Sequence, residues 1–449
     1  MPHRRRQRQI RNILVVYSLV QHPTRQTIRD SLDAFGEYSN ARCYFLNLGV
    51  RRVPWWLRRI EFDAVIFHTT FLSERWNPPA FRRVLRRASR LRGMGRFKAA
   101  LPQDEFLRSE VVQSFVESFD VDHIFSVGPP STWPQLYPDA AGRAALSRVL
   151  TGYLHPGTVE RIDRIVDSSA RRPIDIGYRS RHMAPWLGRH GQLKGHIGEA
   201  VKEAAQSRGL RVDISTRASD TLSGDDWYRF LASCRYTIGV EGGASVHDPD
   251  GTVKECADRY TSAQPSAAFA EVERKCFPGR DGGIDYRALS PRHLEACATR
   301  TCQVLVEGDY SGVLKPEVHY IPLRRDLGNL DQVLDRIQAD ADRARLVEAA
   351  YDEVVASGEY THERLIREVE GRAFVGPPAS ADGWSLEVAH LLSRIAERAA
   401  RGKVALYVAV GTRLRVWAMR TLPEPALRVI RRRVAGTTAE AAAMQSAAD

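Results

Sequence analysis

The residues best suited to chemistry in this chain of 449 residues gather around Glu295. This carboxylate opens a stretch of small residues with helical character, and an apolar strand is predicted directly after it at 303–306. A loop with glycines follows and carries Glu307 and Tyr310. In an open α/β sheet, nucleotides bind in the loops beyond the strand ends and at the helices that these loops lead into. We therefore expect this passage to form part of a nucleotide site.

A second group of candidates consists of basic residues that follow a predicted strand at 174–178. A nucleotide diphosphate that acts as a leaving group needs fixed positive charge, because negative charge builds on its bridging oxygen as the bond breaks. Backbone N–H groups at a helix N-terminus serve the same purpose. We expect at least two of four side chains to touch phosphate, with the others merely exposed: Arg179, Arg181, Arg189 and Lys194.

A third group lies in a glycine-rich loop that leaves the predicted strand at 236–240. Paired glycines let the backbone approach a ligand closely, and a carboxylate at a strand end can accept sugar or ribose hydroxyls. The run at 248–251 lacks the further oxygen ligands of a calcium loop, so we interpret it as a turn. The loop places together the candidates Glu241, Gly242, Gly243 and Ser245.

The first half of the chain offers three candidates for a general base. His68, Asp104 and Glu105 each follow the end of a predicted strand, at the edge expected to face a cleft. A general base must lie within hydrogen-bond reach of the hydroxyl that it deprotonates. The alternatives are a structural role for the histidine and a helix N-cap role for the acids.

Alternating strands and helices in two blocks must position these residues. This alternation predicts parallel α/β sheets, and we expect two Rossmann-like domains that face a cleft. The predicted divisions are a first Rossmann-like domain at 1–155, a linker at 156–172, a second Rossmann-like domain at 173–330, a helical segment at 331–400 and a basic tail at 401–449. The predicted strands are 13–17, 43–48, 64–68, 99–102 and 123–127 in the first block, and 174–178, 211–214, 236–240 and 303–306 in the second.

The chain is strongly basic, with a net charge of +12 and a pI of about 9.6. Such a balance favours an anionic partner, unless it only reflects an arginine-rich composition. Two segments concentrate the charge, 81–98 and 401–434, and the second interleaves it with apolar and aromatic residues as an interfacial helix does. The alternative interpretation of the segment at 401–434 is a terminal helix that packs on the protein. The last residues, 437–449, have a composition typical of disorder.

The apolar runs in the chain are all too short to cross a bilayer. Attraction to an anionic membrane or to a lipid-pyrophosphate acceptor explains the basic segments, and no recognisable nucleic-acid-binding motif accompanies them. We therefore expect a cytoplasmic protein that can sit peripherally on the inner face of the cell membrane. The six cysteines lack paired spacing, so we expect reduced structural thiols and neither a zinc site nor a disulfide.

The second block resembles the C-terminal domain of the GT-B glycosyltransferases, closest to the branch that includes spore-maturation-type and bacterial cell-surface polysaccharide enzymes. The resemblance rests on Arg292 two positions before Leu294-Glu295-Ala296, on the following strand with Glu307-Gly308, and on the run from His319 to Asn329. It implies a GT-B fold with an acceptor-side domain at 1–155 and a donor-side domain at 173–330, in which Glu295 holds the ribose of a sugar donor.

The same resemblance implies a role for the basic pairs Gly188-Arg189 and Lys194-Gly195, which have the spacing that many members place on the donor phosphates. One position departs from the family pattern. Many retaining members carry a second glutamate eight positions before the first, where this chain has Arg287. Glu241 or Glu307 could substitute for it, and the stereochemical outcome stays open.

The resemblance therefore implies a glycosyltransferase that moves a sugar from a nucleoside-diphosphate donor to a saccharide or lipid-linked acceptor, in cell-surface polysaccharide or glycoconjugate synthesis. Arginine and lysine would stabilise the leaving group without an obligatory metal or another cofactor. The alternatives are a non-catalytic nucleic-acid-binding protein on a Rossmann-like scaffold and a sugar-nucleotide epimerase with the same fold.

Overall fold

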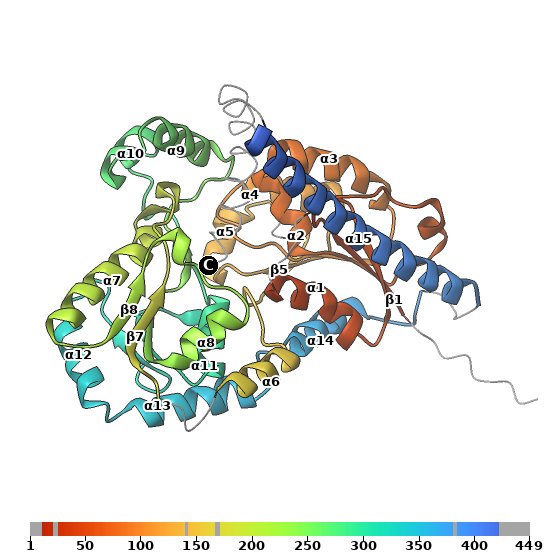
Figure 1. Cartoon of the computed structure of the whole chain (residues 1–449). Helices are drawn as coiled ribbons and strands as arrows, with labels where there is room; N and C mark the ends of the chain where they lie inside the picture. The colour runs from red at the N-terminus through yellow and green to blue at the C-terminus, as the bar shows by residue number, and fades with distance from the viewer. Residues whose placement is uncertain (1–10, 21–25, 140–141, 167–170, 380–383, 422–449) are drawn as a thin grey trace, which may run out of the picture.

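The computed structural model describes residues 11–20, 26–139, 142–166, 171–379 and 384–421, and it describes the side chains of the last helix from Leu386 to Leu406. Two parallel sheets lie side by side, each covered by helices (Figure 1). The predicted α/β fold with two Rossmann-like sheets is confirmed.

The first sheet has six parallel strands in the order β2-β1-β3-β4-β5-β6. Parallel sheets are covered on both faces, so their strands are nearly continuous apolar runs. Strand β1 fits this rule, because all six of its residues are buried. The strands are β1 (Asn12–Tyr17), β2 (Arg42–Asn47), β3 (Ala64–Phe67), β4 (Phe97–Ala100), β5 (His123–Ser126) and β6 (Ala145–Arg148). The last was not predicted, because it is short and only partly buried.

Helices of the first block connect these strands and cover the sheet. Helix α3 is strongly basic, but its buried residues, such as Phe81 and Val84, follow helical spacing and pack on the core. The helices are α1 (Gln26–Tyr38), α2 (Thr69–Leu72), α3 (Pro78–Ala88), α4 (Ser109–Ser118), α5 (Trp133–Leu136) and α6 (Pro156–Ile165). Helix α6 occupies most of the segment predicted as a linker.

The second sheet has five parallel strands in the order β13-β12-β9-β7-β8. These strands are β7 (Ile174–Arg179), β8 (Val212–Ser215), β9 (Cys234–Gly239), β12 (Cys302–Val306) and β13 (Tyr320–Leu323). Part of the predicted glycine-rich loop forms strand β10 (Gly242–Ala244), which pairs with β11 (Tyr286–Ala288) in a two-stranded antiparallel sheet. The associated helices are α7 (Gly188–Ser207), α8 (Asp225–Ser233), α9 (Thr252–Ala263), α10 (Phe269–Cys276) and α11 (Pro291–Ala298).

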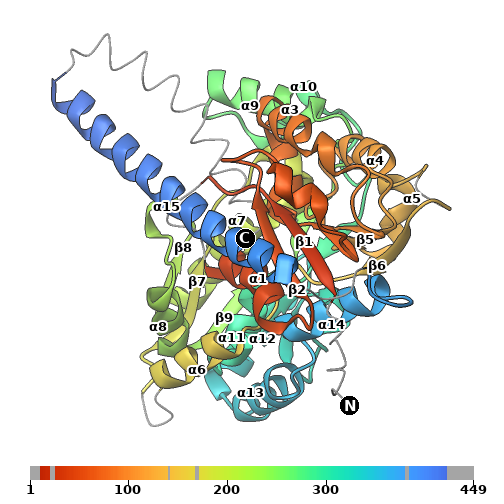
Figure 2. The ribbon, with the colours of Figure 1, turned by 90° about the vertical axis from the view of Figure 1, so that its right-hand side faces the viewer.

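The helices after the second sheet are divided between the domains: the first two pack on the second domain and the last two on the first. Helices α12 (Leu330–Ala339) and α13 (Arg343–Ala350) pack on the second sheet, as the helical spacing of their apolar residues predicted. A π-helix at Tyr351–Ala356 follows. The chain then returns to the first domain, where α14 (His362–Ala373) lies against α1 and α15 (Trp384–Thr421) lies against β2 (Figure 2).

The two domains share a packed contact beside the space that separates their strand ends. The rings of Trp76 and Trp186 meet edge to face, with centroids 5.7 Å apart. Phe106 and Tyr286 meet in the same way at 4.9 Å. Such aromatic pairs stabilise a contact beyond the apolar area that they bury. The contact therefore sets how the two sheets face each other.

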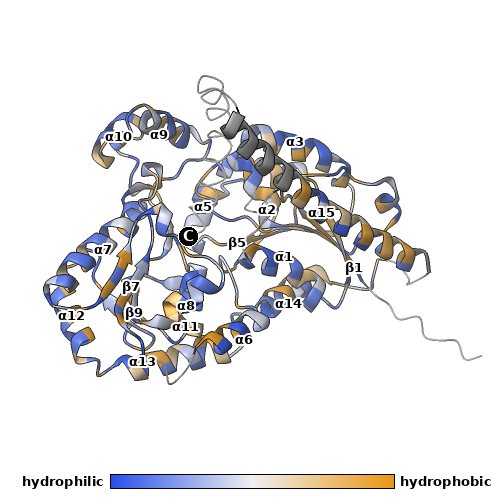
Figure 3. Cartoon of the chain, viewed as in Figure 1, coloured by the Kyte–Doolittle hydropathy of each residue, from blue (hydrophilic) through white to orange (hydrophobic). Residues whose placement is uncertain are grey.

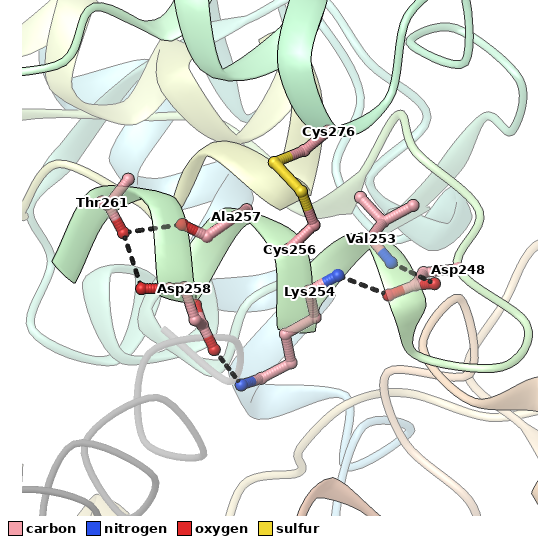
Figure 4. Close-up of a disulfide and its surroundings, with 8 residues drawn as sticks. All are labelled: Asp248, Val253, Lys254, Cys256, Ala257, Asp258, Thr261 and Cys276. Carbon is pink, nitrogen blue, oxygen red and sulfur yellow. Dashed lines mark hydrogen bonds and ion pairs between the residues drawn. A yellow bond between two sulfur atoms is a disulfide. The ribbon is translucent and has the colours of Figure 1, made fainter. Parts of the chain in front are cut away.

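One cysteine prediction is wrong, because Cys256 and Cys276 form a disulfide (Figure 4). Helices α9 and α10 pack as a pair and bring these two residues together, a relationship that a separation of 20 positions in the sequence does not reveal. The other four cysteines are free and buried, as predicted: Cys43, Cys234, Cys297 and Cys302.

The basic tail is described only in its helical part, since residues 422–449 lie outside the described residues. Within the described ranges, no helix combines the length and the apolar character that crossing a membrane requires. The predictions for 422–434 and for 437–449 therefore fall outside the described part of the chain.

Candidate functional site

A cavity of about 490 Å³ lies between the two sheets. From the first domain it is lined by loops at the carboxyl ends of β3, β4, β5 and β6, and from the second by the starts of α8 and α11. Helix α14 adds His362 and Leu365. Ligands of open α/β sheets bind at such strand ends. Four of the predicted site residues line this cavity: His68, Asp104, Arg292 and Glu295.

Glu295 is held in place by an aromatic neighbour that the sequence did not single out. The indole Nε1 of Trp227 donates a hydrogen bond to Glu295 Oε2 at 2.8 Å. The Arg292 guanidinium lies over the same indole ring, 5.0 Å from its centroid. Arg292 also donates from Nη1 to the carbonyl of Arg179 at 2.6 Å. The carboxylate, the ring and the guanidinium therefore form one ordered wall.

A small basic pocket adjoins this wall and shares Thr221 and Arg292 with the cavity. The Arg179 guanidinium is fixed by Asp213, with a nearest N–O distance of 2.8 Å, and lies over the Phe230 ring. The pocket itself has a volume of only about 10 Å³, so an anion of high charge that these cations favour, such as a diphosphate, would lie in the adjoining cavity. Four cationic side chains line the basic pocket: Arg179, Arg181, Lys194 and Arg292.

His68 occupies the N-cap of α2 at the end of β3. Its Nδ1 accepts a hydrogen bond from the backbone N–H of Thr70 at 3.3 Å. The neutral ring therefore carries its proton on Nε2, which lies 3.1 Å from Ser31 Oγ and donates to it. Burial lowers the pKa of His68 to about 4. The imidazole is neutral at ordinary pH and both of its nitrogens are engaged.

Asp104 lies at the carboxyl end of β4 in a left-handed backbone conformation, with φ of 55°. The buried Arg75 guanidinium holds this turn, since it donates to the carbonyls of Gln103 and Asp104. Burial raises the pKa of Asp104 to about 6, although Arg75 and Lys194 lower it. A residue other than glycine with positive φ carries backbone strain, which often marks a functional position. Asp104 thus has the place and the pKa of a general base.

Glu105, the neighbouring candidate, points into the protein interior. It is fully buried and accepts hydrogen bonds from the hydroxyls of Ser126, Tyr137 and Tyr286. Because Tyr286 belongs to the second domain, the carboxylate links the two domains. Glu105 does not line the cavity.

The glycine-rich segment around Glu241 has a structural explanation. Glu241 is buried and accepts a hydrogen bond from the backbone N–H of Tyr310 at 2.7 Å, and burial raises its pKa. Gly243 has φ of 124°, and a Cβ there would lie 2.0 Å from the carbonyl oxygen of Tyr286. The pairing of β10 with β11 therefore demands glycine at this position. Asp248 accepts backbone hydrogen bonds from the first turn of α9, in agreement with the predicted turn.

The remaining predicted donor residues do not line either hollow. Ser245 donates to Asp281, and Arg189 forms ion pairs with Asp281 and Glu273 at the surface. The Tyr310 hydroxyl donates to the carbonyl of Val306, while Glu307 is exposed. Gly242 pairs with Ala288 in the two-stranded sheet.

Sequence reasoning missed three cavity residues of evident importance, namely Trp227, Tyr153 and His362. Trp227 lies on the buried side of the amphipathic helix α8, so its type and spacing looked like core. His362 is buried, and its Nδ1 has no hydrogen-bond partner among the described residues. No local pattern marks it, because only the return of α14 to the first domain brings it to the cavity.

The two parallel sheets, the cavity between their strand ends and the return of the C-terminal helices to the first sheet form a GT-B-like architecture, as the sequence predicted. Among the described residues, no cluster of three or more histidine, cysteine, aspartate or glutamate side chains could hold a metal ion. No model of a known protein family matches the chain, and no curated protein matches it.

Several solved glycosyltransferases have a similar arrangement. Anabaena Alr3699/HepE in complex with UDP-glucose has 11% identity and a TM-score of 0.40, covering 80% of this chain and 99% of that one. A glycosyltransferase from Rickettsia africae ESF-5 has 11% identity and a TM-score of 0.41, with 81% and 98% covered. The DNA modifying enzyme beta-glucosyltransferase has 8% identity and a TM-score of 0.45, with 81% and 99% covered.

Proposed function

We propose that this protein is a glycosyltransferase that uses a nucleoside-diphosphate sugar as its donor. One observation carries the proposal: Glu295 lies on the wall of the interdomain cavity directly beside the basic pocket. A nucleoside diphosphate presents ribose hydroxyls next to two phosphates. A carboxylate beside a cluster of cations matches that order of groups.

In the proposed complex, Glu295 accepts hydrogen bonds from the ribose hydroxyls while Trp227 fixes the carboxylate. Arg181, Lys194 and Arg292 face the diphosphate. These cations act on the leaving group, because negative charge develops there during transfer. Arg179 lines the same pocket, and its guanidinium is bound to Asp213.

The proposed reaction joins an acceptor hydroxyl to the donor sugar. The hydroxyl oxygen forms a bond to the anomeric carbon, and the bond from this carbon to the diphosphate oxygen breaks. The electron pair of the broken bond leaves with the diphosphate, and the proton of the hydroxyl passes to the Asp104 carboxylate. A base with a pKa near 6 is largely ionised at pH 7 and can accept this proton.

The acceptor would lie against the first domain. That wall of the cavity combines apolar side chains, such as Leu101, Phe125 and Val149, with the hydroxyl of Tyr153 and the imidazole of His362. Apolar surfaces with a few polar groups bind amphiphilic molecules and sugar rings. A saccharide or lipid-linked acceptor at the cytoplasmic face of a membrane, in cell-surface glycoconjugate synthesis, fits this wall.

A donor-hydrolysis screen tests the proposal. The full chain is incubated with UDP-, GDP-, ADP- and dTDP-sugars, and release of the nucleoside diphosphate is measured. We expect slow release from one class of donor, and its loss in Arg292→Ala. A chain that neither binds nor hydrolyses any nucleotide sugar would contradict the proposed function.

A further inference from the structure

Helix α15 uses only one of its sides to contact the first domain. Ser393, Glu397, Ala400 and Val404 are buried, and they recur at the three- and four-residue spacing of one helical face. The Tyr17 hydroxyl donates to the Glu397 carboxylate on this side. The docked side of α15 is therefore fixed by packing and by a buried hydrogen bond.

The opposite side of α15 carries large apolar residues exposed to solvent. The relative exposures are 57% for Leu391, 45% for Leu392, 55% for Ile395 and 64% for Leu406. At about 100° per residue, these side chains fall on one stripe along the helix. Hydrophobic residues are visible along several turns of α15 in Figure 3. We call this set the α15 stripe.

Exposed basic residues border the α15 stripe on both sides. Arg394 and Arg398 lie on one side of it by helical geometry, and Lys403 lies on the other. The only acid between 388 and 406 is Glu397, which faces the protein. The outward face of this part of the helix is therefore apolar in the middle and positive at its borders.

The basic helix α3 lies close to the same region. Arg87 of α3 donates to the carbonyls of Leu48 and Gly49. In the same segment, the Arg51 guanidinium lies 3.7 Å from the Glu397 carboxylate of α15. The segment from 48 to 51 thus connects both basic helices, which the sequence had presented as two separate charged segments.

We propose that the outward face of α15 binds an anionic lipid membrane. An apolar stripe with basic borders is the pattern of a helix that lies in the membrane interface, where leucine side chains enter the acyl boundary and arginines meet anionic headgroups. A second copy of this face would bring like charges together, so charge complementarity favours the lipid. The sequence of 401–434 adds nine basic residues against a single acid, Glu424.

Vesicle flotation with the full chain tests this proposal. We expect binding to vesicles of phosphatidylcholine mixed with phosphatidylglycerol, weak binding to phosphatidylcholine alone, and loss of binding as salt rises. The triple variant Arg394→Gln/Arg398→Gln/Lys403→Gln should bind at least tenfold more weakly. The matched control removes the same charge from exposed positions of the second domain: Arg217→Gln/Arg229→Gln/Arg345→Gln. It should bind like the wild type.

A second variant, Leu391→Ser/Ile395→Ser/Leu406→Ser, separates the apolar contribution from the charge. It should retain the wild-type melting temperature, because these side chains are exposed, and should bind the mixed vesicles at least tenfold more weakly. Unchanged binding in both α15 variants would overturn the proposal. So would a concentration-dependent dimer, seen by light scattering without lipid, that the apolar variant abolishes, because the stripe would then bind a second copy.

Discussion

The indole of Trp227 donates a hydrogen bond to the carboxylate of Glu295, and this contact joins two helices of the second domain at the wall of the cavity. The residues are 68 positions apart. The bond fixes the orientation of Glu295 before a ligand arrives. Such preorganisation favours binding, because less conformational freedom is lost when the complex forms.

The first prediction concerns this hydrogen bond. In Trp227→Phe, the ring that lies beneath Arg292 remains but the donor to Glu295 is lost. We expect nucleoside-diphosphate affinity to fall by roughly tenfold, since a hydrogen bond to a charged group contributes about 1.5 kcal/mol. Calorimetric titration measures this change in affinity. Trp133→Phe is the control, because Trp133 bonds to the Gly128 carbonyl away from the cavity, and equal losses in both variants would contradict the assignment.

The second prediction separates two arginines that the sequence treated alike. Arg181 lines the basic pocket, whereas Arg189 lies outside both hollows, where it forms ion pairs with Glu273 and Asp281. Arg181→Gln should weaken nucleoside-diphosphate binding by about tenfold to a hundredfold, because it removes a charge-assisted contact. Arg189→Gln should leave the affinity unchanged. If Arg189→Gln weakens nucleoside-diphosphate binding more than Arg181→Gln does, the phosphates do not bind beside the basic pocket.

The third prediction follows from the raised pKa of Asp104. The transfer rate should rise with pH through about 6 and then level off, because only the ionised carboxylate accepts a proton. The folded state binds this proton more tightly than the unfolded chain does. The free energy of unfolding therefore falls as pH rises from about 4 to about 6, and stays lower above that range.

The variant Asp104→Asn tests both consequences. It should abolish transfer and raise the free energy of unfolding at pH 8 by up to about 3 kcal/mol, since the buried charge is gone. Asp120→Asn is a matched control, because Asp120 is exposed and also has positive φ. Denaturant unfolding and an activity profile measure the two effects. A drop in stability for Asp104→Asn would show that the carboxylate serves the fold.

The fourth prediction concerns His362. Burial lowers its pKa to about 3, so the imidazole is neutral, and Nδ1 has no described partner. His362→Phe should reduce transfer to the acceptor, through a raised KM for the acceptor, while donor hydrolysis and thermal stability are retained. If His362 only fills space in the cavity wall, the phenyl ring should do so equally well, and an unchanged KM for the acceptor would contradict the prediction.

The sequence pattern predicted the sheets well, because buried parallel strands are apolar runs. Strand β12 lies where the pattern placed it, and Glu295 lines the cavity from α11, the helix just before it. The sequence pattern could not show which of Asp104 and Glu105 lines the cavity. A left-handed turn directs these adjacent side chains to different surroundings, and that turn depends on the distant Arg75.

The other differences between the sequence patterns and the structure share one physical cause, which is contact between residues far apart in the chain. In the sequence, Arg189 resembles a phosphate ligand, but in the structure it forms ion pairs with Glu273 and Asp281. Gly243 resembles a ligand-binding glycine in the sequence, but in the structure it lies in β10, which pairs with β11. Cys256 and Cys276 show no motif, and His362 reaches the cavity only because α14 returns to the first domain. Local patterns do not contain these contacts.

The fifth prediction addresses the central claim, that Glu295 and the basic pocket bind a nucleoside diphosphate. The most direct measurement is calorimetric titration of the full chain with UDP and GDP, in Glu295→Ala and in Glu307→Ala as the matched control, since Glu307 is exposed outside both hollows. The account predicts that one nucleotide binds the wild type and Glu307→Ala equally, and Glu295→Ala at least tenfold more weakly. Equal affinity in all three proteins, or no binding of either nucleotide, would contradict it.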